Sequence, residues 1–272
     1  MEPGFDSRMF LDSHAHLEHA HFGEDLNQII QAAWDDGIVR ILAIGNGVPA
    51  DDRVDATISI ADQYDFIYAT VGVHPHDADA ATLNYLEALF RKAAHPKVVA
   101  WGEVGLDYHY NLSTPSNQRR ALEQQLRLAS DAGLPVVIHC REAEEDLLAI
   151  LEAWKRDQPW GVLHCFTGSP RLAELGIELG MYISFSGILT FSKADWLRSI
   201  AQSVPLDRVL VETDCPYLAP VPVRGKRNVP GYVRHTTETL AGLRALSVNG
   251  LLRQLHLNFA ALFATPLPFA IS

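Results

Sequence analysis

The sequence predicts an α/β protein with the architecture of a (β/α)8 TIM barrel, and three observations support this prediction. The chain has 272 residues, 48% hydrophobic and 20% charged, which suffices for one large core. Short apolar runs alternate with longer amphipathic stretches along nearly the whole chain. The first run lacks the glycine-rich turn that typifies a nucleotide-binding doubly wound sheet, the rival architecture.

Eight apolar runs are the predicted strands. Each is short enough for a buried strand and is followed by an amphipathic stretch. Strands that alternate with helices need crossover connections, so we expect a parallel sheet. The predicted strands cover residues 9–14, 40–45, 67–73, 97–103, 134–140, 161–166, 181–186 and 208–214.

The segments between the strands are predicted helices. In the fourth, Leu122, Leu126 and Ala129 follow the i, i+4, i+7 spacing of a buried stripe. We expect a single domain over residues 1–272, with the barrel at about 9–264, a proline- and glycine-rich loop at 217–232 and short tails. The predicted helices cover residues 24–36, 51–65, 79–94, 116–132, 142–156, 170–179, 193–203 and 232–247, with a closing helix at 249–264.

Composition limits the possible partners and the compartment. No run of eighteen apolar residues appears, and the first ten residues lack the pattern of a secretion signal, so we expect a cytoplasmic protein without membrane contact. The net charge of −11 argues against a broad basic surface for nucleic acid, although one basic loop can act locally. The three cysteines are odd in number and far apart, which favours thiols over disulfides. Nothing indicates an obligate protein partner.

Six of the eight predicted strands end in a residue that can bind metal or transfer a proton. Barrel enzymes place their active groups at the carboxyl ends of the strands, so these side chains are expected to meet at one mouth. A metal site is the economical explanation of this distribution. The residues at the six strand ends are His14 with His16, His74 with His76 beyond it, Glu103, His139, His164 and Asp214.

Spacing sharpens the assignment at the first strand. His14 and His16 are two residues apart, so both can face the barrel axis while Ser13 and Ala15 face the helices. His19 and His21 lie past the strand, where we expect solvated loop positions.

The ligand set exceeds what one tetrahedral ion takes, so we predict two divalent ions, with zinc, magnesium, manganese or iron all compatible. Each cysteine directly follows a proposed ligand and is expected to pack outward rather than bind metal. Asp12 and Glu212 share the inward parity one layer deeper, where they either orient imidazoles or form buried salt links. We assign His14, His16, Glu103 and Asp214 to the first ion, and Glu103 as a bridge, His139 and His164 to the second.

Seven ordered motifs resemble the TatD family of metal-dependent hydrolases. The resemblance covers residues 10–263 and implies a metal-dependent barrel related to amidohydrolases, with a deoxyribonuclease activity that trims strands from the 3′ end. It also implies metal binding by the same six residues. Ala15, where a cysteine is frequent, and the closing stretch HLNFAALF depart from the family pattern. The motifs are DSHAHL, GVHPHDA, GEVGLDYHYNLSTPSNQ, LPVVIHCR, HCFTGS, ETDCPYLAP and RNVPGYV.

For a phosphodiester substrate, the predicted catalytic residues are Asp214, Glu103 and His74. Asp214 would accept the proton of the attacking water and His74 would donate to the phosphate or the leaving oxygen. Single-stranded DNA or its 3′ ends are the expected substrate. The predicted substrate-binding residues are His76, Arg141, Arg224 and Arg227, with a salt bridge or helix cap for Arg141 and plain solvation for the loop arginines as open alternatives.

Two other functions remain compatible with these residues. The same binuclear centre could hydrolyse a carboxylic ester, lactone, amide or aminoacyl ester, because it also activates water for attack on carbonyl carbon. A metal-binding barrel without catalytic activity is the third hypothesis.

Overall fold

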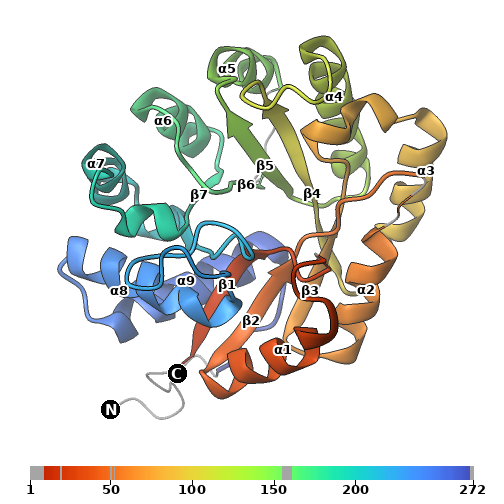
Figure 1. Cartoon of the computed structure of the whole chain (residues 1–272). Helices are drawn as coiled ribbons and strands as arrows, with labels where there is room; N and C mark the ends of the chain where they lie inside the picture. The colour runs from red at the N-terminus through yellow and green to blue at the C-terminus, as the bar shows by residue number, and fades with distance from the viewer. Residues whose placement is uncertain (1–8, 19, 50, 52, 155–160, 270–272) are drawn as a thin grey trace. The chain divides into compact units, whose positions relative to one another are not determined.

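The structure, a computed structural model, describes residues 9–18, 20–49, 51, 53–154 and 161–269 (Figure 1). His19, the predicted N-terminal tail at residues 1–8 and the last three residues, 270–272, therefore lie outside the described residues. The strands follow one another in the sheet in chain order, from β1 to β8. The strands are β1 (Phe10–Ala15), β2 (Ile38–Ala43), β3 (Ile67–Val71), β4 (Val98–Asp107), β5 (Val136–Arg141), β6 (Gly161–Leu163), β7 (Tyr182–Phe185) and β8 (Val209–Val211).

A helix follows each of these strands, which confirms the predicted (β/α)8 architecture. Several helices begin at residues suited to that role: Thr82, Thr114 and Ser169 each accept a hydrogen bond from a backbone N–H of the first turn. The helices are α1 (Leu26–Asp35), α2 (Arg53–Gln63), α3 (Leu83–Lys92), α4 (Pro115–Asp131), α5 (Glu144–Ala153), α6 (Pro170–Glu178), α7 (Asp195–Ser203), α8 (Val233–Leu243) and α9 (Val248–Phe263).

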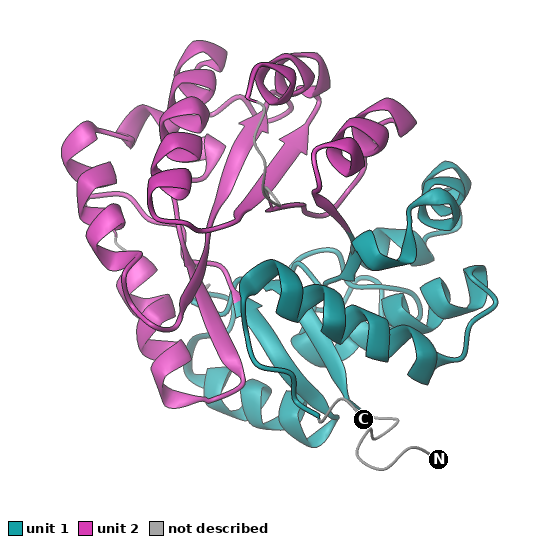
Figure 2. Cartoon of the chain, turned by 180° about the vertical axis from the view of Figure 1, so that it is seen from behind, with its two compact units in different colours: residues 1–42, 184–272 teal, residues 43–183 magenta. Residues whose placement is uncertain are grey.

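The chain divides into two compact units, which are described separately (Figure 2). Unit 1 comprises residues 1–42 and 184–272, and unit 2 comprises residues 43–183. The single domain expected over residues 1–272 stays a prediction.

Unit 1 joins the beginning of the chain to its end. Ala15 pairs in parallel with Cys215, the N–H of His16 donates to the carbonyl of Cys215 at 2.9 Å, and the N–H of Asp214 donates to the carbonyl of His14 at 2.9 Å. Helix α9 packs on this unit through buried residues such as Leu255 and Phe259. The segments that carry predicted ligands from opposite ends of the sequence are thereby held by backbone hydrogen bonds.

In unit 2, strands β3 to β6 pair in parallel, and β4 is longer than predicted. It runs to Asp107, whereas the sequence predicted its end at Glu103. Gly105 explains the error: its φ is +148°, and a Cβ there would lie 2.0 Å from the carbonyl oxygen of His139. This glycine allows two strands to approach closely, and it does not end the strand.

Candidate metal centre

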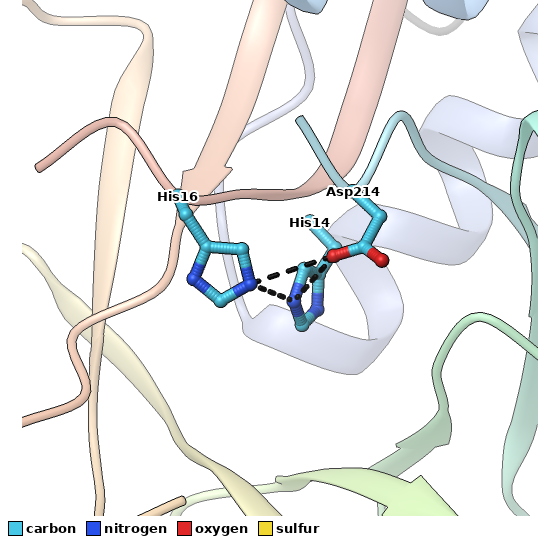
Figure 3. Close-up of side chains that lie close together, drawn as sticks. All are labelled: His14, His16 and Asp214. Atoms are coloured by element: carbon cyan, nitrogen blue, oxygen red, sulfur yellow. Dashed lines mark hydrogen bonds and ion pairs between the residues drawn. The ribbon is translucent and has the colours of Figure 1, made fainter. Parts of the chain in front are cut away.

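The first ligand cluster consists of His14, His16 and Asp214 in unit 1 (Figure 3). The two imidazoles turn their Nε2 atoms toward each other at 3.2 Å. Asp214 Oδ1 lies 3.6 Å from His14 Nε2 and 3.4 Å from His16 Nε2. The sequence prediction that these three side chains meet is confirmed within this unit.

The loop that carries Asp214 is held by buried hydrogen bonds. Asp214 adopts a φ of +58°, and the buried amide of Asn228 donates to the carbonyls of Thr213 at 2.9 Å and Tyr217 at 2.5 Å. Asn228 is a residue that the sequence analysis missed. Its side-chain amide links the backbone before Asp214, at Thr213, to the backbone after it, at Tyr217.

Asp12 binds backbone N–H groups beside the first ligand cluster, whereas the sequence analysis expected it to orient an imidazole or to form a salt link. Its Oδ1 accepts from the backbone N–H of His14 at 3.2 Å and of Thr213 at 2.8 Å, and no described interaction places it on an imidazole. Burial raises the pKa of Asp12 to about 8, against the hydrogen bonds from Thr213 and His14. Asp12 thus joins the ends of β1 and β8 through their backbones, and neither a salt link nor an imidazole contact is its role in this structure. Glu212 is buried, and its predicted role stays a prediction.

The spacing within the first cluster suits a divalent ion. Around a tetrahedral zinc ion with bonds of roughly 2.0 to 2.1 Å, neighbouring ligand atoms lie about 3.3 Å apart. The three distances here are 3.2, 3.4 and 3.6 Å. With both Nε2 atoms unprotonated, the two imidazoles would offer two lone pairs to a single cation between them.

The second ligand cluster consists of Glu103, His139 and His164 in unit 2. Glu103 Oε1 lies 2.9 Å from His139 Nδ1 and 2.6 Å from His164 Nε2, and these two nitrogens are 3.3 Å apart. His164 directly follows β6, and its N–H donates to the carbonyl of Ile138 at 3.0 Å, which continues the pairing with β5. The predicted ligands of the second ion are therefore brought together.

His74 approaches the same carboxylate oxygen of Glu103, with Nε2 at 3.4 Å from Oε1. Its Nδ1 accepts from the backbone N–H of His76 at 3.1 Å, so the proton of the neutral ring is on Nε2. Burial lowers the pKa of His74 to about 4, with Glu103 acting in the opposite direction. His74 is thus a neutral N–H donor at pH 7, and ligation through Nε2 would require the other tautomer.

Asp107 was missed by the sequence analysis because the predicted strand ended before it. Its carboxylate is 1% exposed, and Oδ2 lies 3.1 Å from His139 Nε2 and 3.0 Å from His76 Nε2. Burial opposes ionisation, but hydrogen bonds from His139, Tyr110 and His76 lower the pKa of Asp107. Asp107 therefore orients His139 from the side away from Glu103, as carboxylates do for metal-bound imidazoles.

Two further polar residues brace the ligands. Asn46 accepts from the N–H of Glu103 at 2.9 Å and places its Nδ2 3.4 Å from Oε2 of the same residue. Glu18 Oε1 lies 4.0 Å from His16 Nδ1, with its side chain 1% exposed. Sequence analysis identified neither residue.

The predicted substrate-binding arginines have different surroundings. The Arg141 guanidinium lies 4.8 Å from the ring centroid of Tyr110, and that of Arg224 lies 4.0 Å from the centroid of Phe191. Arg227 instead binds the carbonyl of His21 at 2.7 Å and Asp25 at 3.1 Å. Arg227 thus fastens its loop to the segment after β1, while Arg141 and Arg224 are exposed and stacked on aromatic rings.

The cysteines remain thiols, as predicted: no disulfide joins Cys140, Cys165 or Cys215. Burial raises the pKa of Cys140 to about 12 and raises that of Cys215 as well.

Within the described residues, no helix combines the length and the apolar character needed to cross a membrane.

Comparisons with known proteins place the chain in a family. A family model described as TatD related DNase matches residues 11–264. The uncharacterised metal-dependent hydrolase YabD of Bacillus subtilis (strain 168) is 39% identical over 239 residues, which cover 88% of this chain and 92% of YabD. The 3′-5′ ssDNA/RNA exonuclease TatD of Escherichia coli (strain K12) is 34% identical over 257 residues, which cover 93% of this chain and 98% of that protein.

A solved structure shares the fold. The TatD homolog YJJV from Escherichia coli K12 matches with a TM-score of 0.87 and 28% identity, covering 96% of this chain and 100% of that one. The (β/α)8 architecture, the two clusters of imidazoles and carboxylates and the family match along most of the sequence lead to the same result. The chain belongs to the family of TatD-related DNases and is a metal-dependent hydrolase.

Proposed function

We propose that this hydrolase is a phosphodiesterase that removes nucleotides from the 3′ end of single-stranded DNA. The single observation that carries the proposal is the pair of ligand clusters, each built from imidazoles and one carboxylate at strand ends. The relative from Escherichia coli named as a 3′-5′ ssDNA/RNA exonuclease supports the choice of substrate and polarity.

Each cluster is proposed to hold one divalent ion. Imidazole and carboxylate ligands together suit zinc or manganese, and phosphoryl chemistry also uses magnesium. The bridging of the two ions by Glu103 stays a prediction.

Bound divalent ions would supply the Lewis acidity that neutralises the phosphate and makes water a nucleophile near neutral pH. Asp214 has one carboxylate oxygen, Oδ1, within 3.6 Å of His14 Nε2 and 3.4 Å of His16 Nε2, and its carboxylate is the proposed acceptor of a proton from the attacking water. His74, neutral and protonated at Nε2, can donate a hydrogen bond to a phosphate oxygen without adding charge. Arg141 is the proposed partner of a backbone phosphate at the carboxyl end of β5.

The test uses protein stripped of metal and reloaded with zinc, magnesium or manganese one at a time. Oligodeoxynucleotides labelled at the 5′ end should shorten stepwise, and the same strands with a blocked 3′ end should persist. Glu103→Gln should abolish the shortening, because Oε1 faces three imidazole nitrogens within 3.4 Å. His95→Gln is the matched control, because His95 pairs with Asp62 on the surface at 3.5 Å.

A second assay distinguishes phosphodiester hydrolysis from hydrolysis at carbonyl carbon. A panel of carboxylic esters, lactones and amides is assayed with the same loaded protein. If the panel is hydrolysed while every oligonucleotide stays intact, the proposed phosphodiesterase function is wrong. If neither is hydrolysed under any metal, the barrel binds metal without catalysing hydrolysis of these bonds.

A further inference from the structure

Tyr217 lies beside the first ligand cluster and is exposed. Its ring centroid is 6.2 Å from that of His16, with the two planes at 72°, and 46% of the residue is exposed. The N–H of Tyr217 donates to the carbonyl of Asp214 at 2.9 Å, so one turn carries both a predicted ligand and this aromatic ring. The exposed part of this ring is therefore accessible beside the first ligand cluster.

The turn that presents Tyr217 is rigidly built. The buried Asn228 amide donates to the carbonyl of Tyr217 at 2.5 Å, and the N–H of Asn228 donates to the carbonyl of Pro216 at 3.1 Å. Further along the loop, the N–H of Val221 donates to Thr190 Oγ1 at 2.9 Å. The backbone that carries the ring is therefore held by hydrogen bonds before any substrate arrives, which lowers the entropic cost of ordering this loop on binding.

The charge of the protein indicates how a nucleic acid is held here. The net charge of −11 argues against broad electrostatic attraction to phosphates as the main source of affinity. Stacking of bases on aromatic rings provides affinity for single strands without reading their sequence. Within the described part of this loop, Arg224 adds a local cation, stacked on Phe191 at 4.0 Å.

We propose that Tyr217 stacks on the base of the 3′-terminal nucleotide and so holds the adjoining phosphodiester at the first ligand cluster. This inference rests on the proposed function and adds a residue that selects for a nucleotide at the strand end. The stacking acts on substrate binding, so it affects KM more than kcat.

The experiment compares Tyr217→Ala and Tyr217→Phe on two oligodeoxynucleotides, one ordinary and one whose 3′-terminal nucleotide lacks its base. Trp34→Ala is the matched control, because Trp34 on α1 is also exposed, at 48%, but lies near the amino end of β1. Its carbonyl accepts from the N–H of Gly37, and the carbonyl of Gly37 accepts from the N–H of Phe10 in β1. A 2-aminopurine at the 3′ end, with calcium in place of the catalytic metal, reports stacking by quenching of its fluorescence. Metal content is measured for every variant.

We expect Tyr217→Ala to raise KM for the ordinary strand by about five- to a hundredfold, with kcat within about twofold. On the strand without the terminal base, wild type and Tyr217→Ala should have equal KM. Tyr217→Phe and Trp34→Ala should behave as wild type, and only Tyr217→Ala should lose the fluorescence quenching.

Two results would overturn the stacking role while leaving the proposed function intact. One is an unchanged KM in Tyr217→Ala, and the other is an equal loss on both strands, which would show that Tyr217 acts through the position of His16. Failure of the wild-type protein to cleave either strand under any metal would overturn the proposed function itself, and the stacking role with it.

Discussion

Asp107 and His139 form a partly buried hydrogen bond: Asp107 Oδ2 lies 3.1 Å from Nε2 of His139, while Nδ1 of the same ring faces Glu103 at 2.9 Å. The imidazole is thus held between two carboxylates. Burial disfavours the charged ring, but the hydrogen bonds that the ring donates to Asp107 and Glu103 outweigh it and raise the pKa of His139. An environment that favours positive charge on this ring also favours a cation at Nδ1, because the cation takes the place of the proton.

We expect Asp107→Asn to weaken metal binding by about ten- to a hundredfold, because the anionic partner that orients His139 is lost. The measurement is competition with a chelator of known affinity. Asp146→Asn is the control, because Asp146 pairs with Arg119 and Tyr108 instead of a predicted ligand. Equal affinities in wild type and Asp107→Asn would contradict the orienting role.

Asp214→Asn should lower kcat by about 10²- to 10⁴-fold, because the amide cannot accept the proton of the attacking water. The exposed Asp207→Asn serves as the control. Metal content and the free energy of unfolding are measured alongside, since Asp214 also belongs to the first ligand cluster. A variant that keeps its metal and also keeps full activity would exclude Asp214 as the proton acceptor.

Arg141→Ala should raise KM for single-stranded DNA by about five- to tenfold, because a phosphate contact made by a planar fork of donors is removed. Arg141→Lys should recover only part of this loss, since an ammonium group cannot bind two phosphate oxygens in the same geometry. Arg127→Ala, on the exposed face of α4, is the control. If the KM of Arg141→Ala equals that of the control, Arg141 only stacks on Tyr110.

His256 should make the protein less stable in mild acid. Burial lowers its pKa to about 4, with Arg40 contributing in the same direction and the hydrogen bond to Met9 opposing. An unfolded chain has a histidine pKa near 6.5, so between these values the unfolded state binds more protons and stability falls as pH falls. The contribution of neutral His256 to the free energy of unfolding is therefore fully present above about pH 7 and is lost progressively on acidification toward pH 4.

The expected loss from His256 is about 2 kcal/mol between pH 7.5 and pH 5, at about 1.4 kcal/mol per pH unit within the window. Urea unfolding of wild type and His256→Gln at both pH values measures it, because glutamine can donate to Met9 but does not titrate. The difference in stability between the two pH values should shrink by that amount in His256→Gln and remain in His95→Gln. A pH dependence unchanged in His256→Gln would mean that another group is responsible.

Local patterns in the sequence were sufficient for the architecture and for the ligand types. Apolar runs of strand length alternate with amphipathic stretches, so the parallel (β/α)8 order followed from side-chain periodicity alone. His14 and His16 could be paired because residues two apart on a strand share a face. Residues at the ends of the predicted strands, such as His139, Glu103 and Asp214, could be collected as ligands because parallel strands end on one side.

The partners that hold those ligands were decided only by the tertiary structure. Asp107 lies 32 positions from His139, and Asn46 lies 57 positions from Glu103. Whether such residues meet depends on strand register, and a glycine such as Gly105 could equally end a strand or let two strands approach. The turn that sets Tyr217 beside His16 likewise exists only once the segments after β1 and β8 pair. Sequence periodicity determines which face a side chain occupies, whereas contacts between distant residues arise from backbone pairing, which no local pattern encodes.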